Sequence, residues 1–440
     1  MSKGLGKYLS RQELSRPLSG PGVNRGGYQA AVVVPALAES EDLPATLASL
    51  AASEGEIARR TLVLVVVNNP APSIATGGED ESARRRRRDN QATLGWLHGH
   101  ASSFPFGLAW IDAASPEREF PGRAGVGAAR KAGCDSVLRQ IADRPGFSDL
   151  PPERFTLFHL DGDTLVHPGY LEAGAGAIQA DNECASGVIA FRHRMGRQPA
   201  ITAAINAYEL YLHYYVLGLR FAGSPYAFHT VGSTMVSSAE AYLKVAGIPA
   251  GRQAGEDFYF LQKLAKTSGV KPIATTAVYP SPRPSRRVPF GTGPRIYRAL
   301  NEDTQFETYD PEVFRVLSRI HSTMRDHADS SAGYLLAAFP ESARDFMEKR
   351  QFNRVWALFR RQYQDTRSRR QAFHQWFDGF ATLKLIHQLT RTRRSQRPLF
   401  DCWDELVREY GLPELAGGAV ERRLHGFRCY WWGNRCPASR

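Results

Sequence analysis

Runs of consecutive apolar residues alternate with stretches of helical periodicity along the first part of the chain. Residues 30–35 and residues 61–67 are apolar almost throughout, a pattern typical of parallel strands that are buried on both faces. Between them, residues 45–52 carry Leu47 and Leu50 at helical spacing. A strand, a helix and a second strand in this order predict a right-handed βαβ unit.

Further apolar runs extend this pattern. Strand-like segments follow at residues 106–111, 155–160 and 187–191, and a tyrosine-rich helix is predicted over residues 201–219. The tyrosines of that helix have two interpretations, which are core packing and contact with a sugar or lipid. From about residue 310 onward the strand-like patterns end and helical patterns dominate.

The order of these elements predicts the fold class and the division of the chain. We expect an α/β fold with a mixed, Rossmann-like sheet flanked by helices, followed by a mostly helical C-terminal region. Residues 1–27 are rich in Gly, Ser, Pro and Arg and predict a flexible tail. The α/β domain is expected at residues 28–305 and the helical region at residues 306–440.

The composition is that of a globular protein with a basic surface. The chain has 440 residues, of which 42% are hydrophobic, and this is enough for a sizeable core. Its formal net charge of +12 suits contact with nucleic acid, anionic lipid or phosphorylated substrates. Because no zinc finger, basic zipper or aromatic RNA-binding strand is recognisable, we expect no nucleic-acid partner.

Cysteine usage and hydropathy bear on the compartment. The five cysteines are scattered and show neither CxxC pairs nor zinc-ligand spacing, which favours free thiols in a reducing cytoplasm. The first residues, MSKGLGKYLSRQ, are polar and basic and do not resemble a signal peptide. The apolar runs are strand-sized and shorter than the ~18 residues of a membrane span. We therefore expect a cytoplasmic protein.

A pair of aspartates directly follows the apolar run at residues 155–160. Asp161 and Asp163 flank Gly162, whose missing side chain permits a close approach of other groups. Ligands of open α/β sheets bind at the carboxyl ends of the strands, and two carboxylates there can hold a divalent cation. Such an ion stabilises an anionic leaving group such as a diphosphate. The Asp-x-Asp motif alone is common, so its meaning depends on the surrounding sequence.

Four stretches of the chain, in this order, resemble the family 2 glycosyltransferases, which have the GT-A fold. They are the run VVVP at residues 32–35 with Glu39, Leu43, Leu47 and Leu50, LVVVNN at residues 64–69, LDGD at residues 160–163 with PGYL at residues 168–171, and GEDFYF at residues 255–260. The similarity extends from about Gln29 to Arg295, more than half of the chain. It implies metal-dependent, inverting transfer of a hexose-like sugar from a UDP- or GDP-sugar to an acceptor hydroxyl.

The resemblance also implies roles for individual residues. The nucleotide-sugar site would comprise Pro35, Ala36, Glu39, Asn68, Asn69, Arg130, Asp161 and Gly162. Asp163, together with Asp161, would ligate Mg²⁺ or Mn²⁺. Asp257 would be the general base that takes the proton of the acceptor hydroxyl, with Glu256 beside it. A base on the face opposite the diphosphate gives in-line displacement and inversion at the anomeric carbon.

Departures from the family pattern leave the nucleotide open. Asn68-Asn69 stands where the family usually has two aspartates, which keeps hydrogen-bonding capacity and removes charge. Ala38 stands where the family usually has an asparagine. The family's additional metal-binding histidine has no counterpart here, because no histidine lies between Asp257 and His321. The metal would then rely on Asp163, the diphosphate and water.

Two loops offer further contacts. The proline-rich loop at residues 281–293 contains Arg283, Arg286 and Arg287, and we predict that these arginines clamp the diphosphate, with an exposed basic loop as the alternative. The sequence HTVGS at residues 229–233 contributes candidate contacts of the acceptor or the donor sugar, namely His229, Gly232 and Ser233. For His229, a structural role is the alternative.

Two basic stretches carry no recognisable motif. Five arginines at residues 84–88 lie in a low-complexity stretch, residues 76–89, which predicts a solvated insertion loop or an anion-binding loop. Residues 422–432 mix basic and aromatic side chains, as interfacial membrane contacts do, although packing within the protein gives the same composition. One hypothesis is therefore a peripheral protein on the inner face of the membrane, acting on a lipid-linked acceptor.

Two other functions stay open. A sugar nucleotidyltransferase on a similar scaffold usually has a glycine-rich basic loop after the first strand, whereas residues 39–42 of this chain (ESED) are acidic. A basic membrane-surface binding protein with an inactive GT-A domain fits the net charge. This last hypothesis leaves the intact carboxylates without a role.

Overall fold

The chain divides into two compact units. The first comprises residues 1–201, 230–297 and 428–440, and the second comprises residues 202–229 and 298–427. Within these ranges, the computed structural model describes residues 3–10, 15–70, 81–120, 125–180, 184–251, 255–285, 291–302, 306–392 and 396–439. The division differs from the boundary expected near residue 305, because residues 202–229 belong to the second unit and residues 428–440 to the first.

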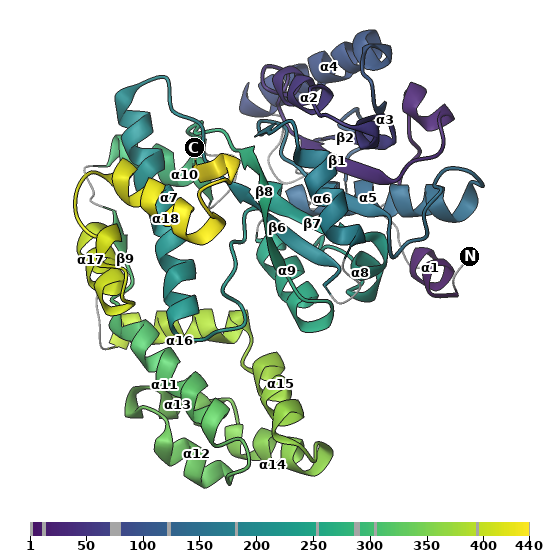
Figure 1. The fold of residues 1–440 in the computed structure, drawn as a ribbon. Helices are drawn as coiled ribbons and strands as arrows, with labels where there is room; N and C mark the ends of the chain where they lie inside the picture. The colour runs from purple at the N-terminus through teal and green to yellow at the C-terminus, as the bar shows by residue number, and fades with distance from the viewer. Residues whose placement is uncertain are drawn as a thin grey trace. The chain divides into compact units, whose positions relative to one another are not determined.

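The first unit is built on a mixed eight-stranded sheet (Figure 1). In the order β3-β2-β1-β4-β7-β6-β8-β5, its strands are Gly107–Ala113, Thr61–Asn68, Ala30–Ala36, Thr156–His159, Met235–Ser238, Ser186–Phe191, Lys271–Tyr279 and Leu165–Val166. The first four are parallel, β7 is antiparallel to β4 and β6, β8 is parallel to β6, and β5 is antiparallel to β8. It follows that β1, β2, β4, β6 and β8 all end at the same edge of the sheet.

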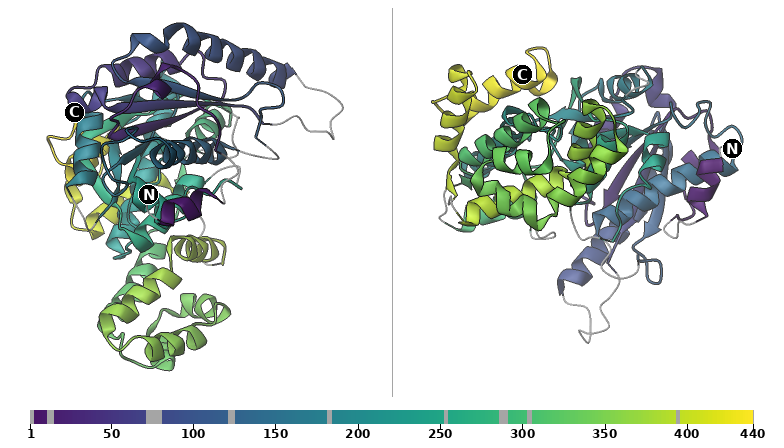
Figure 2. Two further views of the ribbon diagram at one scale, coloured as in Figure 1. Left: turned by 90° about the vertical axis from the view of Figure 1, so that its right-hand side faces the viewer. Right: turned by 90° about the horizontal axis from the view of Figure 1, so that it is seen from below.

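Helices cover both faces of this sheet (Figures 1 and 2). Gly133 of α5 (Val126–Asp143) packs against Val33, and Tyr170 of α6 (Tyr170–Gln179) packs against Phe158. Phe158 is the register partner of Val32, so it points to the face opposite Val33. Burial on both faces explains why every position of β1 and β2 is buried.

The remaining helical elements of the first unit surround the sheet. They are α1 (Lys3–Leu9), η1 (Pro21–Asn24), α2 (Leu43–Ala51), α3 (Glu56–Arg59), α4 (Glu81–His100), η3 (Ala101–Ser103), η4 (Gly232–Thr234), α8 (Ala239–Lys244), α9 (Glu256–Thr267) and η6 (Pro437–Ser439). The predicted fold class is thus confirmed: a mixed α/β sheet flanked by helices, with a mostly helical C-terminal region.

The loop predicted at residues 76–89 is wrong for the part that the structure describes, because residues 81–89 begin the helix α4. Arginine has a high helix propensity, and Glu81 in the first turn forms ion pairs with Arg84 and Arg88. The buried stripe of the helix begins only after the arginines, with Asn90, Thr93, Leu94 and Leu97. Residues 76–80 lie outside the described residues.

The N-terminal segment, predicted to be a flexible tail, is docked where the structure describes it. Leu5 and Leu9 of α1 are buried. The hydroxyl of Tyr8 donates a hydrogen bond to Asp135 Oδ1 of α5 at 2.7 Å and accepts one from Lys131 at 2.7 Å. The partner residues are more than a hundred positions away in the sequence, so composition alone gives no sign of this docking.

The second unit is almost entirely helical. Its helices, some of which continue into the first unit, are α7 (Pro199–Phe221), α10 (Thr292–Asn301), α11 (Glu312–Asp326), α12 (Ala332–Ala338), α13 (Glu341–Lys349), α14 (Phe352–Gln362), α15 (Thr366–Trp376), α16 (Gly379–Thr392), α17 (Leu399–Glu409), η5 (Pro413–Leu415) and α18 (Val420–Trp432). Two short strands, β9 (Glu307–Thr308) and β10 (Arg397–Pro398), form an antiparallel pair. Their two-residue length explains why no strand signal was visible in this region.

Tyrosines of α7 pack in the core of the second unit. The buried Tyr214 donates a hydrogen bond to the carbonyl of Tyr309 at 2.6 Å and packs edge-on against Phe314. For this residue the core-packing interpretation is therefore the one that the structure supports. No helix among the described residues has the length and apolar character needed to cross a membrane.

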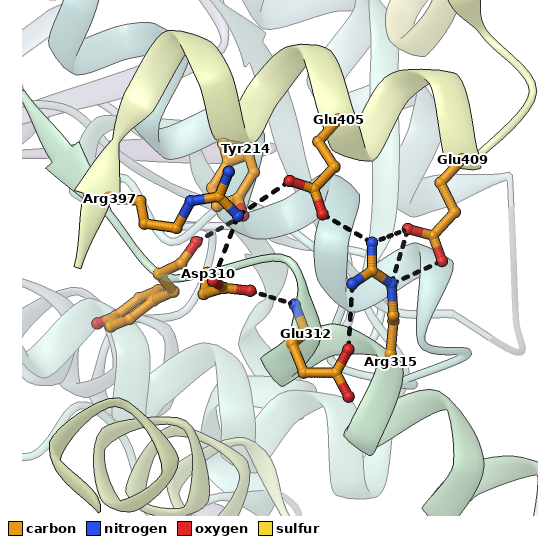
Figure 3. Close-up of polar contacts among 8 residues, drawn as sticks. Tyr214, Asp310, Glu312, Arg315, Arg397, Glu405 and Glu409 are labelled. Atoms are coloured by element: carbon orange, nitrogen blue, oxygen red, sulfur yellow. Dashed lines mark hydrogen bonds and ion pairs between the residues drawn. The ribbon is translucent and has the colours of Figure 1, made fainter. Parts of the chain in front are cut away.

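An ion-pair network joins α11, α17 and the β9–β10 pair (Figure 3). Arg315 pairs with Glu405 at 2.8 Å and with Glu409 at 2.6 Å. Arg397 pairs with Glu405 at 2.9 Å and with Asp310 at 3.3 Å. Arg315 also pairs with Glu312 of its own helix at 3.1 Å, so each arginine bridges carboxylates from two places in the chain. Such a network stabilises the arrangement of these elements better than an isolated surface pair does.

The C-terminal helix α18 turns most of its large apolar side chains inward. Leu424, Phe427 and Trp432 are buried, whereas Tyr430 is 39% exposed. Arg423 forms a two-pronged contact with Asp404, at 3.1 and 3.0 Å, and does not project into solvent. Packing within the protein thus accounts for Arg423, Phe427 and Trp432, whereas Arg422 and Tyr430 remain exposed.

Candidate active site

Chain topology brings the sequence-predicted residues to one edge of the sheet. Pro35 and Ala36 end β1, Asn68 ends β2, and Asp161 follows β4. These strands are parallel and adjacent, so their carboxyl ends lie side by side. This is the edge at which open α/β sheets bind their ligands.

A buried arginine is the centre of the site. Arg130 of α5 is 2% exposed, and its guanidinium donates from Nη2 to Asp161 and from Nη1 to Glu256. Gly232 closes over the same group, since a Cβ at position 232 would lie 2.6 Å from Arg130 Nη2. Because a buried cation must be paired to be tolerated, the two carboxylates hold Arg130 in place and are held by it.

Asp257 has an unusual titration. It is half-buried in the first turn of α9, and its Oδ1 accepts a hydrogen bond from the backbone N–H of Phe258 at 2.7 Å. Burial, reinforced by the like charge of Glu256, raises the pKa of Asp257 to about 7, while Arg130 acts in the opposite direction. A carboxylate of this kind can accept a proton near neutral pH.

A second arginine, Arg283, binds several acidic side chains at and beside the Asp-x-Asp motif. Arg283 donates to both oxygens of Glu39 at 2.8 Å, to Asp42 at 2.8 Å and to Asp163 at 3.3 Å. Arg194 donates to the main-chain carbonyl of Asp163 at 2.8 Å. Of the three arginines of the predicted basic clamp, Arg286 and Arg287 lie outside the described residues. Arg283 contacts these carboxylates, and its contact with a diphosphate stays a prediction. Arg194 was not predicted.

The Asp-x-Asp turn packs directly on the loop after β1. A Cβ at Gly162 would lie 3.2 Å from Glu39 Cγ and 3.3 Å from the carbonyl oxygen of Pro35. Thr46 of α2 donates its hydroxyl proton to the carbonyl of Gly162 at 2.9 Å. A side chain at this position would push its neighbours by a few tenths of an ångström, so glycine suits the close packing of the two loops.

The asparagines after β2 are buried and tied to α4. Asn90 donates to the carbonyl of Asn68 at 3.1 Å and accepts from the N–H of Ala38 at 2.9 Å, so one side chain links the ends of β1 and β2. Asn69 is 5% exposed, and its Oδ1 has no hydrogen-bond partner among the described residues. Asn90 was not predicted, because its position in α4 becomes meaningful only once the helix is seen to start before it.

The three candidate sugar contacts of the HTVGS segment, His229, Gly232 and Ser233, are divided between the two units of the structure. Gly232 and Ser233 belong to the first unit. Gly232 packs against Arg130, and the next residue, Ser233, is buried. His229 belongs to the second unit, where its Nε2 lies 2.9 Å from Nδ1 of His213. Burial holds the pKa of His229 well below its usual range. A contact of any of the three with a sugar stays a prediction.

The carboxylates that follow β4 have the donor type of a site for a hard divalent cation. Asp161 and Asp163 supply the hard oxygen ligands that Mg²⁺ and Mn²⁺ prefer. In the part of the chain that the structure describes, no group of three or more His, Cys, Asp or Glu side chains is arranged to hold a metal. The donor type therefore fits, and the remaining coordination positions would have to come from ligands other than protein side chains.

The chain is similar to known proteins in the comparison with solved structures and in neither of the sequence comparisons. No protein-family model matches the sequence, and no curated protein sequence matches it. S. aureus TarS 1-349, which has also been solved with UDP-GlcNAc, is 12% identical over 76% of this chain and 91% of that chain, with a TM-score of 0.37.

Two further structures are similar at the same level. Mannosyltransferase PcManGT from Pyrobaculum calidifontis, solved with GDP-Man and Mn²⁺, is 15% identical over 89% of this chain and 96% of that chain, with a TM-score of 0.34. Glucosyl-3-phosphoglycerate synthase from Mycobacterium tuberculosis, solved with UDP, is 15% identical over 64% of this chain and 84% of that chain, with a TM-score of 0.32. Similarity of this degree transfers no activity to this chain.

Proposed function

We propose that the protein is a metal-dependent inverting glycosyltransferase of the GT-A type, which moves a sugar from a nucleotide-diphosphate sugar to an acceptor hydroxyl. The observation that carries this proposal is the buried guanidinium of Arg130, which pairs with Asp161 on one side and with Glu256 on the other. Residues proposed for the donor and for the acceptor thus meet in one site, although 126 positions separate Arg130 from Glu256.

The nucleotide would bind at the ends of β1 and β2. The buried Oδ1 of Asn69, which lacks a partner among the described residues, is an acceptor for a base N–H group. Uracil and guanine both present such a group, which agrees with a UDP- or GDP-sugar donor. Pro35 and Ala36 line the same edge of the sheet.

Asp163, with Asp161, would hold the divalent cation, whose charge would offset that of the departing diphosphate. Arg283 already contacts the Asp163 carboxylate, and this is the longest of its contacts, at 3.3 Å. An arginine and a metal ion cannot share the same carboxylate lone pairs. A cation that took this lone pair of Asp163 Oδ2 would displace Arg283 from Asp163, and Glu39 and Asp42 would still hold the arginine.

Asp257 would act as the general base. Its raised pKa, about 7, makes it a stronger proton acceptor than an ordinary aspartate while leaving part of it ionised near neutrality. Glu256 is engaged by Arg130, which leaves Asp257 as the carboxylate of this pair that the acceptor hydroxyl can use.

We also propose that the protein works in the cytoplasm at the inner face of a membrane, on a lipid-linked acceptor. The support lies in α4, where the side chains of Arg84 and Arg88 are 58% and 68% exposed. Anionic lipid attracts each such charge by about 1 kcal/mol.

The central proposal is tested by combining donor binding with turnover. Thermal shifts would be measured for a panel of nucleotide sugars with and without Mn²⁺, and turnover by release of the nucleoside diphosphate. A true donor should raise the melting temperature only with the metal. We expect Asp163→Ala to lose that metal-dependent shift. Asp257→Asn should keep the shift and lose turnover by about 100-fold or more.

Asp143→Asn serves as the matched control, since this aspartate lies at the end of α5 with a side chain that is 59% exposed. It should behave as the unmodified protein in both assays. Full turnover by Asp257→Asn would refute the assignment of the base. If no nucleotide sugar in the panel shifted the melting temperature, the function itself would be excluded.

A further inference from the structure

A basic pocket lies beside the Asp-x-Asp turn and has no part in the donor site described above. Its volume is about 460 Å³, within the usual range for small-molecule sites. The residues that line it include two arginines, two histidines and a tyrosine, namely Arg192, Arg194, His167, His193 and Tyr279. Met195, which is 58% exposed, also lines it.

Strand pairing explains why these side chains converge. Tyr279 ends β8 and is the register partner of Leu165 in β5, two residues before His167. The chain beyond β6 continues alongside β8, because Arg192 donates its N–H to the carbonyl of Val278 at 3.1 Å. Since β6 and β8 run parallel to β4, the pocket lies at the same edge of the sheet as Asp161.

Among the described residues, those that line the pocket include no acidic side chain, so the lining does not compensate its positive charge. The side chain of Arg192 has no hydrogen-bond or ion-pair partner among the described residues, and it is only partly exposed. His167 accepts a hydrogen bond at Nδ1 from the N–H of Gly169 at 3.1 Å, so its neutral form carries the proton on Nε2. Two cationic side chains and two further donors, from His167 and Tyr279, form a set suited to an anion.

The position of the pocket separates it from the nucleotide. Arg194 lines the pocket and also donates to the carbonyl of Asp163, so the Asp-x-Asp turn forms the border. Asn68 and Asn69 lie at β2, beyond β1 and β4 in the sheet order, whereas the pocket lies at β6, β8 and β5. A donor whose base is bound at β2 and whose diphosphate is at Asp163 would place its sugar toward the pocket.

We propose that this pocket binds a phosphate or carboxylate group carried by the acceptor, and that it selects anionic acceptors for the sugar transfer. The inference rests on the proposed glycosyltransferase function. Guanidinium groups recognise both kinds of anion through paired hydrogen bonds, and a pocket without acidic residues rejects neither.

The test is equilibrium binding of a small probe to the full-length protein. Glycerol 3-phosphate and acetate represent the two anions, and glycerol is the uncharged counterpart. We expect the unmodified protein to bind at least one of the two anions and not glycerol, and Arg192→Gln to weaken that binding by about tenfold or more. Tyr279→Phe, which keeps the ring, should weaken it by about threefold. Arg197→Gln, an exposed arginine outside the pocket, should leave it unchanged.

A parallel titration with UDP and GDP in the presence of Mn²⁺ distinguishes the two sources of an anion. If Arg192→Gln weakened nucleotide and probe alike, the pocket would belong to the donor diphosphate and the inference would be overturned. Probe binding that is absent, or equal in the Arg192 and Arg197 variants, would also overturn it. Failure of the glycosyltransferase function would show instead as a lack of nucleotide-sugar binding and turnover, with binding of the probe retained.

Discussion

At the scale of single residues, Asp257 is the group whose chemistry the surrounding structure changes most. Burial and the charge of Glu256 raise its pKa to about 7, so the site contains a base matched to neutral pH. If Asp257 must be ionised to take the acceptor proton, kcat/KM should rise about tenfold per pH unit below about pH 7 and level off above it. Initial rates across the pH range measure this directly.

The residual activity of Asp257→Asn provides the control, because its kcat/KM should not change around pH 7 once the titrating carboxylate is removed. An unmodified protein whose kcat/KM stayed constant down to about pH 5 would contradict the assignment, since an ordinary aspartate would be ionised there.

The raised pKa of Asp257 also makes the stability of the folded protein depend on pH. The folded-state pKa lies above the ordinary value of 3.8, so the folded protein binds more protons than the unfolded chain between about pH 4 and about pH 7. The contribution of Asp257 to stability therefore falls as the pH rises through that window. In line with this sign, Asp257→Asn should melt about 2 °C or more above the unmodified protein at about pH 8, and the gap should narrow at about pH 5.

At the scale of elements, α4 links the two loops of the proposed nucleotide site, after β1 and at the end of β2. Asn90 bonds to Ala38 after β1 and to Asn68 at the end of β2. The preceding residue, Asp89, accepts from both the N–H and the hydroxyl of Ser40, at 3.0 and 2.8 Å. The loop after β1 is therefore shaped by a helix that begins more than forty residues later in the chain.

We predict that Asn90→Ala lowers the free energy of unfolding by about 1–3 kcal/mol, because the partly buried N–H of Ala38 and the buried carbonyl of Asn68 lose the hydrogen bonds to Asn90. It should also weaken nucleotide binding, since both loops are freed. Urea denaturation and titration with UDP or GDP give the two readings. Gln91→Ala changes the exposed neighbour and should affect neither. Equal effects of the two substitutions would show that Asn90 does not position the loops.

The success of sequence-based prediction varied among the elements for physical reasons. The strands β1, β2 and β4 were recognisable because burial on both faces leaves an uninterrupted apolar run. The start of α4 was not, since its five arginines have no hydrophobic periodicity and its buried stripe begins at Asn90. The strand β5 has only two residues, too few for any pattern.

At the scale of the whole molecule, what could not be predicted is pairing over long distances in the sequence. The Asp-x-Asp and Glu256-Asp257 motifs were identified separately, but only the fold shows that Arg130 joins them. Arg283 and Glu39 are 244 positions apart, and no local pattern reports that the acidic loop after β1 meets the basic loop after β8. Composition suggested a membrane contact through the C-terminal aromatic residues, yet two of them, Phe427 and Trp432, are buried.

That burial changes the form that any membrane contact can take. With Phe427 and Trp432 inside the protein, attraction to a membrane must come from the net charge of +12 and from exposed arginines such as Arg84 and Arg85 of α4.

We predict that the protein floats with vesicles containing phosphatidylglycerol but not with phosphatidylcholine alone, and that ~0.5 M salt abolishes the association by screening. The double substitution Arg84→Gln and Arg85→Gln should lower partitioning about thirtyfold. Tyr430→Ser removes an exposed aromatic group and should have little effect. Absence of flotation at low salt, or a loss caused by Tyr430→Ser alone, would contradict an electrostatic contact through α4.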